Sequence, residues 1–477
     1  MFNSVSPSTA FKRVTLTCTI DCRLLYLLFL FLFLLADSTL YGATWRAGFA
    51  KHVITPAEPT WMAGYASRNR PAEGKIGELY AKAMVLEDVN KQRFVLVTLD
   101  LISVPHTLRD YLENYVHDQF DLPPASLLIN CSHTHCGPEI RTTRWSEDAN
   151  HSDRLTLARK YVAILKTSLA AVIDSATGRL EPVSLVFCHS RCGFAMNRRT
   201  PRGSGFINFP NPEGPVDHDV PVLKFTAADG TIKGIIFGYA CHNTTLGIYK
   251  FSGDYAGVAQ KQLENTYADA IALFVLGCGA DINPYPRGTV ALAEIHGTTL
   301  ATSVQAALQT TPTILNEPLD LSYEKVKLKY SPAPSKEELI TRSRSSNSYE
   351  SLHAERLLKQ LDQQGHLLTE YNAPVQVIRF GKQLTWIALP GETCVDYSLR
   401  LKAELENHKD LGRLWVSGYS NDVFAYLPSR RVLLEGGYEG GGAMKYFTTV
   451  LQHGPFASDI EQRIIGKVNQ LLQRSSQ

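Results

Sequence analysis

The sequence lacks the features that mark several large classes of protein. Its 477 residues carry 48 Lys and Arg against 46 Asp and Glu, and the resulting charge of +2 gives no reason to expect nucleic acid as a partner. No apolar run reaches the roughly 20 residues that cross a bilayer. The glycine-rich stretch at 436–442 is not followed directly by Lys and Ser/Thr, as a phosphate-binding loop requires, so nucleotide binding is excluded. A hydrophobic content of 44% describes a folded globular chain.

Cysteine is also sparse, and its pattern argues against a disulfide framework. Of the nine cysteines, Cys18 and Cys22 lie near the N-terminus, which leaves an odd number of seven in the body of the chain. No C-x-x-C metal motif occurs. Cys188 and Cys192 could pair across a turn, whereas most of the others lie in apolar segments, where free cysteine behaves as a small buried hydrophobe.

The N-terminus has the pattern of a targeting segment. Basic residues precede the uncharged run Leu24–Ala36, whose about 13 residues match the core of a secretory signal. We therefore expect a signal peptide or signal anchor over residues 1–43, with cleavage near Ala43. The body of the protein, residues 44–477, is then exported and is periplasmic, secreted or membrane-anchored.

Hydrophobic periodicity predicts an α/β fold of layered mixed sheets with flanking helices in a single large domain. The expected strands cover 93–100, 127–130, 183–188, 220–226, 232–240, 271–277, 376–380, 384–389 and 413–418. The expected helices cover 106–120, 152–176, 256–268, 295–309, 395–407 and 458–474. The strands at 220–226 and 232–240 flank Asp229-Gly230, which indicates an antiparallel hairpin.

Residues 331–370 break this pattern. Ser335 with Glu338 three residues later has the signature of a capping box, and leucines follow it. We expect a helical excursion on the surface, which acts as a lid or decorates an edge.

Candidate metal ligands follow several apolar segments. His133 and His135 come at the end of a predicted strand, where residues i and i+2 share a side and can converge on one ion. His242, Glu392 and Tyr426 each follow another apolar segment. Two imidazoles and a carboxylate are ligands that keep a zinc ion Lewis-acidic and leave a position for water.

Three other kinds of protein are alternatives to a zinc hydrolase of this kind. A barrel amidohydrolase also begins with His-x-His, but no strand-borne metal-bridging lysine stands out after His135. A serine hydrolase needs Gly-x-Ser-x-Gly, and Gly203-Ser204-Gly205 is too short for it. An exported, non-catalytic binding protein for carbohydrate or lipid remains a different alternative.

A series of motifs resembles one known family in both content and order. These motifs are Met62–Ala66, Leu79–Ala83, Leu96–Asp100, Ser132–Pro138, Asn197-Arg198, Cys241–Thr244, Ser252–Asp254, Gly279–Asp281, Leu389–Glu392, Tyr426 and Tyr438–Gly440. Together they cover roughly residues 45–445. The family is that of the neutral/alkaline, non-lysosomal ceramidases, exported zinc amidases that cleave the N-acyl bond of ceramide.

The resemblance implies a role for each matching residue. The implied zinc ligands are His133, His242, Glu392 and Tyr426. The implied catalytic groups, which contact the carbonyl oxygen or move a proton, are His135, Arg198 and Tyr438. The implied substrate-binding residues are Asn197 and Asn283.

The chain also departs from the family pattern. Asn283 stands where the family has a serine, which puts the choice of head group in question, and Phe424-Ala425 replaces the Thr-His that precedes the ligand tyrosine. No C-terminal β-sandwich is expected after the catalytic domain.

The resemblance implies a function: zinc-dependent cleavage of the N-acyl amide bond of a ceramide-like lipid by metal-activated water. A different N-acyl compound, a small amide or an ester is the alternative substrate. Peripheral contact with a membrane is expected, and nucleic acid is not.

Overall fold

The computed structural model describes residues 45–144 and 152–474. The expected targeting segment at 1–43 lies outside these residues. Within the described ranges, no helix combines the length and the hydropathy needed to cross a bilayer.

The largest sheet has nine strands, which run in the spatial order β10-β9-β8-β5-β1-β2-β3-β4, with β12 beside β5. Their bounds are β1 (Trp45–Val53), β2 (Tyr80–Glu87), β3 (Arg93–Leu99), β4 (Leu127–Cys131), β5 (Glu181–Arg191), β8 (Asp219–Ala227), β9 (Ile232–Tyr239), β10 (Ile271–Leu276) and β12 (Thr313–Leu315). The pairs at the two edges, β3 with β4 and β9 with β10, are parallel, and the other pairs are antiparallel. The strands that carry histidines at their ends therefore lie near opposite edges of one sheet.

A second sheet has four strands in the order β13-β14-β15-β17. Their bounds are β13 (Leu319–Lys329), β14 (Glu370–Phe380), β15 (Leu384–Ala388) and β17 (Arg413–Ser417). Alternate residues of β14 face different cores: Val377 packs toward the helices, and Ile378 packs toward the large sheet. Trp386 and Trp415 stack at 4.2 Å between the two sheets. This packing makes the sheets two adjacent inner layers.

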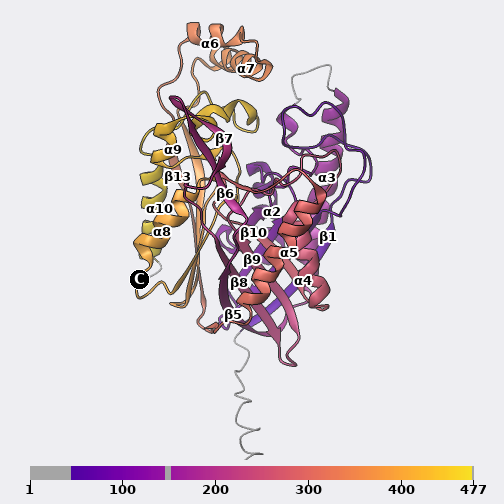
Figure 1. The fold of residues 1–477 in the computed structure, drawn as a ribbon. Coiled ribbons are helices and arrows are strands. Elements are labelled where there is room, and N and C mark those ends of the chain that lie inside the picture. Colours follow the sequence, from indigo (N-terminus) through magenta and orange to yellow (C-terminus); the bar gives the residue numbers. More distant parts are fainter. Residues whose placement is uncertain (1–44, 145–151, 475–477) are drawn as a thin grey trace, which may run out of the picture. The chain divides into compact units, whose positions relative to one another are not determined.

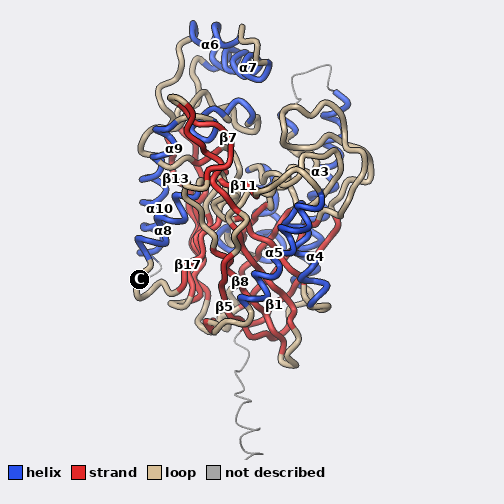
Figure 2. Tube along the Cα trace, in the orientation of Figure 1, coloured by secondary structure: helices blue, strands red, loops and turns tan. Residues whose placement is uncertain are grey.

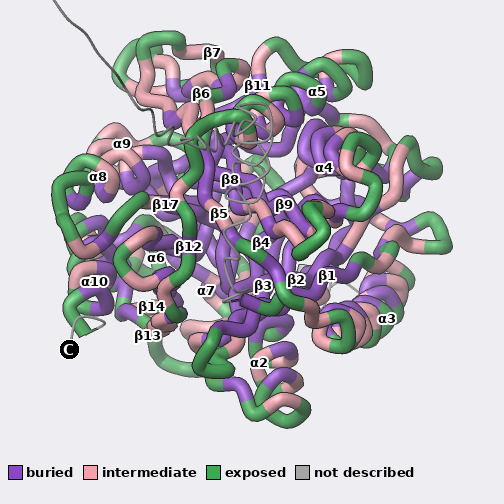
Figure 3. Tube along the Cα trace, turned by 90° about the horizontal axis from the view of Figure 1, so that it is seen from below, coloured by how far each residue is buried: buried purple, intermediate pink, exposed green. Residues whose placement is uncertain are grey.

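Helices cover the outer face of each sheet (Figures 1 and 2). On the large sheet these are α2 (His106–Phe120), α3 (Ser152–Thr177), α4 (Asp254–Thr266) and α5 (Val290–Ala307), and on the smaller sheet they are α8 (Val395–Leu405) and α10 (Ile460–Arg474). The order of layers is helix, sheet, sheet, helix. Figure 3 shows the strands of the large sheet buried between exposed segments of the peripheral helices. The predicted layered α/β fold is confirmed.

Two small sheets and three further helices add to these layers. The small sheets are β11-β6-β7, formed by Ile282–Pro284, Ala195–Arg202 and Gly205–Asn211, and β16-β18, formed by Glu392–Thr393 and Tyr426–Leu427. Residues 331–370 contain α6 (Lys336–Ser343) and α7 (Ser348–Gln364), and the short α9 spans Arg430–Glu435. The capping box at Ser335 and Glu338 is formed in full.

The structure contains strands that hydrophobic periodicity does not predict. It also shows whether the cysteines are paired. The predicted hairpin of β8 and β9 is antiparallel, as expected. Strands β1, β2, β6, β7 and β13 were not expected. All seven cysteines of the described residues are free and buried, Cys188 and Cys192 included, so the pairing considered for these two is not formed.

Candidate active site

The candidate ligands lie in or directly after strands of two of the sheets. His133 follows β4 and His242 follows β9, both in the large sheet. Glu392 and Tyr426 lie directly opposite each other in the parallel pair β16 and β18. The two edge strands of the large sheet, β4 and β10, are joined by the side chain of Asn130, whose Oδ1 accepts from the Leu276 amide at 2.9 Å. This contact draws the separate strand ends together.

His133 and His135 reach the site from a turn and not from a strand. β4 ends at Cys131, and His133 has a φ of +56°, a left-handed conformation that is uncommon for a residue with a side chain. The expectation that a shared strand face aligns the two rings was therefore wrong. The turn still places their Nε2 atoms 3.1 Å apart.

The two buried histidines His133 and His242 are held in the same way. Nδ1 of His133 lies 2.6 Å from the carbonyl oxygen of Ile102, and Nδ1 of His242 lies 2.6 Å from that of Gly279. Because a carbonyl only accepts, each Nδ1 carries the proton in these contacts, and each Nε2 keeps its lone pair. Burial lowers the pKa of both rings, to about 4 for His242, which keeps them neutral. Neutral imidazole with a free Nε2 is the form that binds metals.

Glu392 lies between these two free nitrogens. Its Oε2 is 3.3 Å from Nε2 of His133 and 3.3 Å from Nε2 of His242. Burial opposes ionisation of this carboxyl, but the neighbouring His133, His242 and Tyr426 lower its pKa to about 2. The group is therefore a carboxylate at neutral pH.

The spacing of these atoms is that of ligands around one metal ion, and they do not satisfy one another by hydrogen bonds. Nε2 of His242 and Oε2 of Glu392 are buried and have no hydrogen-bond partner among the described residues. Ligands at about 2.0–2.1 Å from a tetrahedral zinc ion are separated by about 3.3–3.4 Å, and two of the observed separations are 3.3 Å. The donor set thus satisfies the charge and spacing of such a site.

A third histidine belongs to the same cluster. The ring nitrogens of His133, His135 and His242 all lie within 4.8 Å of one another, so these three residues could hold a metal ion. The motif resemblance implies a catalytic role for His135. Its position beside the two predicted ligands is compatible with catalysis and with metal binding. Burial, and then the neighbouring His133, lower the pKa of His135 well below its usual value.

Arg198 connects the predicted tyrosine ligand to an ion-pair network. Its Nη2 donates to the hydroxyl of Tyr426 at 3.1 Å, and its Nε donates to Glu439 at 2.8 Å. Arg199 donates to the other oxygen of Glu439 at 2.6 Å. Burial would lower the pKa of Arg198, but Tyr426 and Glu439 raise it well above its usual value. The guanidinium is therefore charged and is held in a fixed orientation.

Tyr438, the other predicted tyrosine, packs against Tyr426 with ring centroids 5.4 Å apart. Burial raises its pKa, so its hydroxyl keeps the proton at neutral pH and can donate it to a hydrogen bond. The residue is 42% exposed and lies at the mouth of the cavity.

The two predicted substrate-binding asparagines do not line the cavity. Asn197 uses its amide on the carbonyl of Pro215 and on Asp281, and Asn283 accepts from Nη1 of Arg198 at 3.2 Å. The structure therefore places Asn283 one contact away from the cavity, behind Arg198. Direct contact of either asparagine with a substrate remains a prediction.

The candidate residues open into a cavity of about 270 Å³. His133, His135, His242, Glu392, Arg198, Tyr426 and Tyr438 all line it, together with residues that sequence reasoning did not select. Arg141, which is paired with Glu139 at 2.6 Å, and Tyr65, which packs its ring 4.9 Å from that of His135, are the main additions. Tyr65 belongs to the Met62–Ala66 motif, which could have drawn attention to it.

Two further residues that were missed act behind the cavity. The side-chain amide of Asn130 also donates to the carbonyl of Gly418 at 2.8 Å, which ties β4 to the loop after β17. Asp281 accepts from the amide of Val395 at 2.9 Å, and its carbonyl oxygen accepts from the amide of Arg198 at 2.8 Å. The available signals were the position of Asn130 at the end of the predicted strand 127–130 and the place of Asp281 in the Gly279–Asp281 motif.

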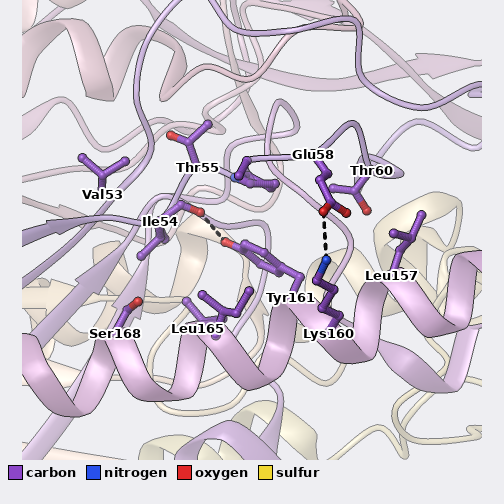
Figure 4. A pocket seen from close by; sticks show the side chains of 13 residues that line it. Val53, Ile54, Thr55, Glu58, Thr60, Leu157, Lys160, Tyr161, Leu165 and Ser168 are labelled. Carbon is purple, nitrogen blue, oxygen red and sulfur yellow. Dashed lines mark hydrogen bonds and ion pairs between the residues drawn. The ribbon is translucent and has the colours of Figure 1, made fainter.

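A second cavity, of about 220 Å³, lies between α3 and the segment after β1 (Figure 4). Its charged side chains, Lys160 and Glu58, pair with each other at 2.8 Å, and the hydroxyl of Tyr161 donates to the carbonyl of Ile54 at 2.6 Å. Its lining is otherwise mostly apolar, and none of its residues is a histidine or cysteine. The chemistry is therefore concentrated in the first cavity.

Comparison with known proteins agrees with the motifs. The family model described as neutral/alkaline non-lysosomal ceramidase, N-terminal, matches residues 45–298. Neutral ceramidase 1 of Arabidopsis thaliana is 24% identical over 283 residues, which cover 56% of this chain and 35% of that protein. The chain thus matches only about a third of the length of that relative.

Solved structures show the same fold. The crystal structure of neutral ceramidase from Pseudomonas aeruginosa has a TM-score of 0.67 and 18% identity, over 90% of this chain and 75% of that one. A structure described as ceramidase complexed with C2 has a TM-score of 0.66 and 18% identity, over 90% and 76%. At these identities the likeness concerns the fold. Because the family model matches more than half of the sequence, this chain belongs to the neutral/alkaline non-lysosomal ceramidase family.

Proposed function

We propose that the protein is a zinc-dependent hydrolase that cleaves the N-acyl amide bond of a ceramide-like lipid. The observation that carries the proposal is the position of the Glu392 carboxylate, 3.3 Å from the free Nε2 atoms of both His133 and His242. A zinc ion bound there supplies Lewis acidity and a water molecule that ionises near neutral pH. Family membership supports an amide of ceramide type as the substrate.

The residues of the chain have separate tasks in this reaction. His133, His242 and Glu392 would hold the ion, and the hydroxyl of Tyr426, opposite Glu392, would be a fourth ligand. Arg198 and Tyr438 present a charged and a neutral donor to the cavity, where they would stabilise negative charge that develops on the carbonyl oxygen. His135, which is neutral at rest, would accept the proton that the attacking water loses and pass it to the leaving amine.

The ion-pair network behind Arg198 supports this assignment. A catalytic donor is most effective when its orientation is set before the reaction, and Glu439 and Asn283 fix two edges of the guanidinium. Asn283 therefore helps to orient the guanidinium of Arg198. The substrate alternatives are other N-acyl compounds and esters.

Export and membrane contact are part of the same proposal. They depend on the apolar run Leu24–Ala36 and on the lipid nature of the substrate. Fractionation of cells that express the full chain, with the N-terminus of the mature protein determined by mass spectrometry, tests export directly.

The function is tested by measuring bound zinc and hydrolysis of a panel of N-acyl substrates with different head groups. The wild-type protein should contain one zinc ion per chain and hydrolyse N-acylsphingosine, and His133→Ala should lose both properties. His189→Ala, which changes a half-exposed histidine paired with Asp219, is the matched control and should keep both. Full hydrolysis after complete removal of the metal would overturn the proposal.

A further inference from the structure

A tyrosine of the helical hairpin of α6 and α7 contacts two residues that line the catalytic cavity. Tyr349, in the first turn of α7, donates its hydroxyl to the carbonyl oxygen of Ala66 at 2.8 Å. Its ring packs against Tyr446 with centroids 5.1 Å apart. Ala66 and Tyr446 both line the catalytic cavity, but they belong to segments far apart in the chain. Tyr349 therefore links two walls of the opening.

The hairpin is built as a small unit with its own core. Leu339, Leu357 and Leu367 pack together, and Leu451 of the neighbouring loop packs against them. At its base, the amide of Ser331 donates to the carbonyl of Pro455 at 2.9 Å. Figure 1 shows α6 and α7 beyond the ends of the strands, apart from the main layers. Among the described residues of the hairpin, Tyr349 provides the hydrogen bond to the wall that carries Gly64, Tyr65 and Ala66.

Aromatic rings continue from Tyr349 into the site. The ring of Tyr446 lies 6.1 Å from that of Tyr438, which lies 5.4 Å from that of Tyr426. These four tyrosines form a continuous wall from the hairpin to the predicted metal ligand. Tyrosine rings offer a hydrocarbon chain an apolar surface, and their hydroxyls keep a polar edge.

The opposite wall, formed by Gly64, Tyr65 and Ala66, also contacts the site. Ala66 follows Tyr65, whose ring packs against His135 at 4.9 Å. A Cβ atom at Gly64 would come within 2.4 Å of Nδ1 of His135, so this segment fits closely on the histidine. The hydrogen bond from Tyr349 to Ala66 is therefore one residue away from the ring that packs against His135.

We propose that Tyr349 determines substrate specificity by holding the α6–α7 hairpin across the opening, so that substrates with long acyl chains are admitted more slowly than those with short chains. The proposal rests on the function proposed above. It assigns residues 331–370 the task of a cover, and it predicts a preference that the residues around the metal do not explain.

The test compares two N-acylsphingosines, one hexanoyl and one palmitoyl, presented in the same mixed detergent micelles. The readout is the ratio of kcat/KM for palmitoyl over hexanoyl. Tyr349→Ala removes both contacts and should raise the ratio about tenfold, whereas Tyr349→Phe removes only the hydrogen bond and should raise it about threefold. Leu352→Ala, a change at a 44% exposed position on the same helix, should leave the ratio unchanged.

The outcomes separate the two proposals. Hydrolysis of the hexanoyl substrate by every variant, with a ratio that stays at the wild-type value in both Tyr349 variants, would overturn the role of Tyr349 and leave the proposed function intact. Failure of the wild-type, zinc-loaded protein to hydrolyse either substrate would overturn both. A general loss of structure would lower both rates together and leave their ratio unchanged, so a raised ratio in Tyr349→Phe reports on the opening itself.

Discussion

The two large sheets contribute different halves of the candidate site. The nine-stranded sheet supplies His133 and His242 from loops, each held by a backbone carbonyl at 2.6 Å. The smaller sheet leads to Glu392 and Tyr426, which are held opposite each other by a two-residue parallel ladder. The nitrogen donors and the oxygen donors thus come from different layers, and the site exists only when the two layers are packed together.

The region matched by the family model ends close to the boundary between these two halves. The matched region, residues 45–298, contains the histidines and Arg198, whereas Glu392, Tyr426 and the α6–α7 hairpin lie beyond it. The family model therefore covers the histidine half and does not extend to Glu392, Tyr426 or the hairpin. Substitutions in each half test whether both are necessary for activity.

The largest effect is expected from removing one ligand from each sheet. His242→Ala and Glu392→Ala should each abolish zinc binding and lower kcat/KM by roughly 10³-fold or more, because each removes part of the same site. Zinc content and hydrolysis of N-acylsphingosine measure this. If Glu392→Ala kept its zinc and its rate while His242→Ala lost both, the smaller sheet would not contribute to the metal site.

A smaller loss is expected when the link between the halves is altered at Arg198. Arg198→Lys keeps the charge but cannot contact Glu439, Asn283 and Tyr426 together, since one ammonium group replaces a planar guanidinium. We expect kcat to fall about 10²-fold with zinc content unchanged. The exposed Arg202→Lys is the control, and equal rates in the two variants would show that Arg198 has no catalytic part.

Asn130 tests the packing of the layers without touching the site. Asn130→Ala leaves the amide of Leu276 and the carbonyl of Gly418 without their buried partner, which should lower the free energy of unfolding by about 2 kcal/mol. Urea unfolding of the metal-free protein measures the change. The exposed Asn372→Ala should have little effect, and an equal loss in both variants would mean that Asn130 does not hold the strand ends together.

The smallest effect concerns a buried carboxyl in the loop between the halves. Burial raises the pKa of Asp422 to about 7, against about 3.9 in an unfolded chain, so the folded state holds the proton more tightly. The resulting stabilisation is complete below about pH 4 and is lost as the pH rises toward 7. Asp422→Asn should therefore remove about 1 kcal/mol of the decrease in unfolding free energy between pH 5 and pH 6. Identical pH profiles for the variant and the wild type would contradict this.

Asp422 and Glu392 are both buried carboxyls, and their different surroundings give them different pKa values. Glu392 faces two imidazoles, and its pKa falls to about 2, whereas Asp422 accepts from the hydroxyl of Tyr371 and has no such neighbours, so burial dominates. The sequence contains no sign of this difference, because it depends on residues that meet only after folding.

Strong hydrophobic periodicity was sufficient to predict many elements. Helix α2 (His106–Phe120) has the predicted bounds, and α3 differs from its predicted end by one residue. Strand β2 was missed because Lys82 interrupts its apolar pattern. This lysine is buried and pairs at 2.6 Å with Glu264, a partner 182 residues away, so only tertiary structure makes its place in a strand acceptable.

The candidate site shows the same limit. Motif order selected the candidate ligands that the structure brings together, but neither the left-handed turn at His133 nor the pairing of Glu392 with Tyr426 could be predicted, since both depend on contacts between layers. The contact of Tyr349 with the cavity wall could not be predicted for the same reason. Its partner Ala66 is 283 residues away, and a tyrosine in a polar helix carries no mark of such a contact.

The central claim is that ligands from two sheets share one metal ion. The most direct measurement is anomalous diffraction at the zinc absorption edge, from crystals of the zinc-loaded protein. The account predicts one peak at about 2.0–2.2 Å from Nε2 of His133, Nε2 of His242 and an oxygen of Glu392. A zinc ion held by the histidines with Glu392 turned away, or a peak elsewhere in the protein, would contradict it.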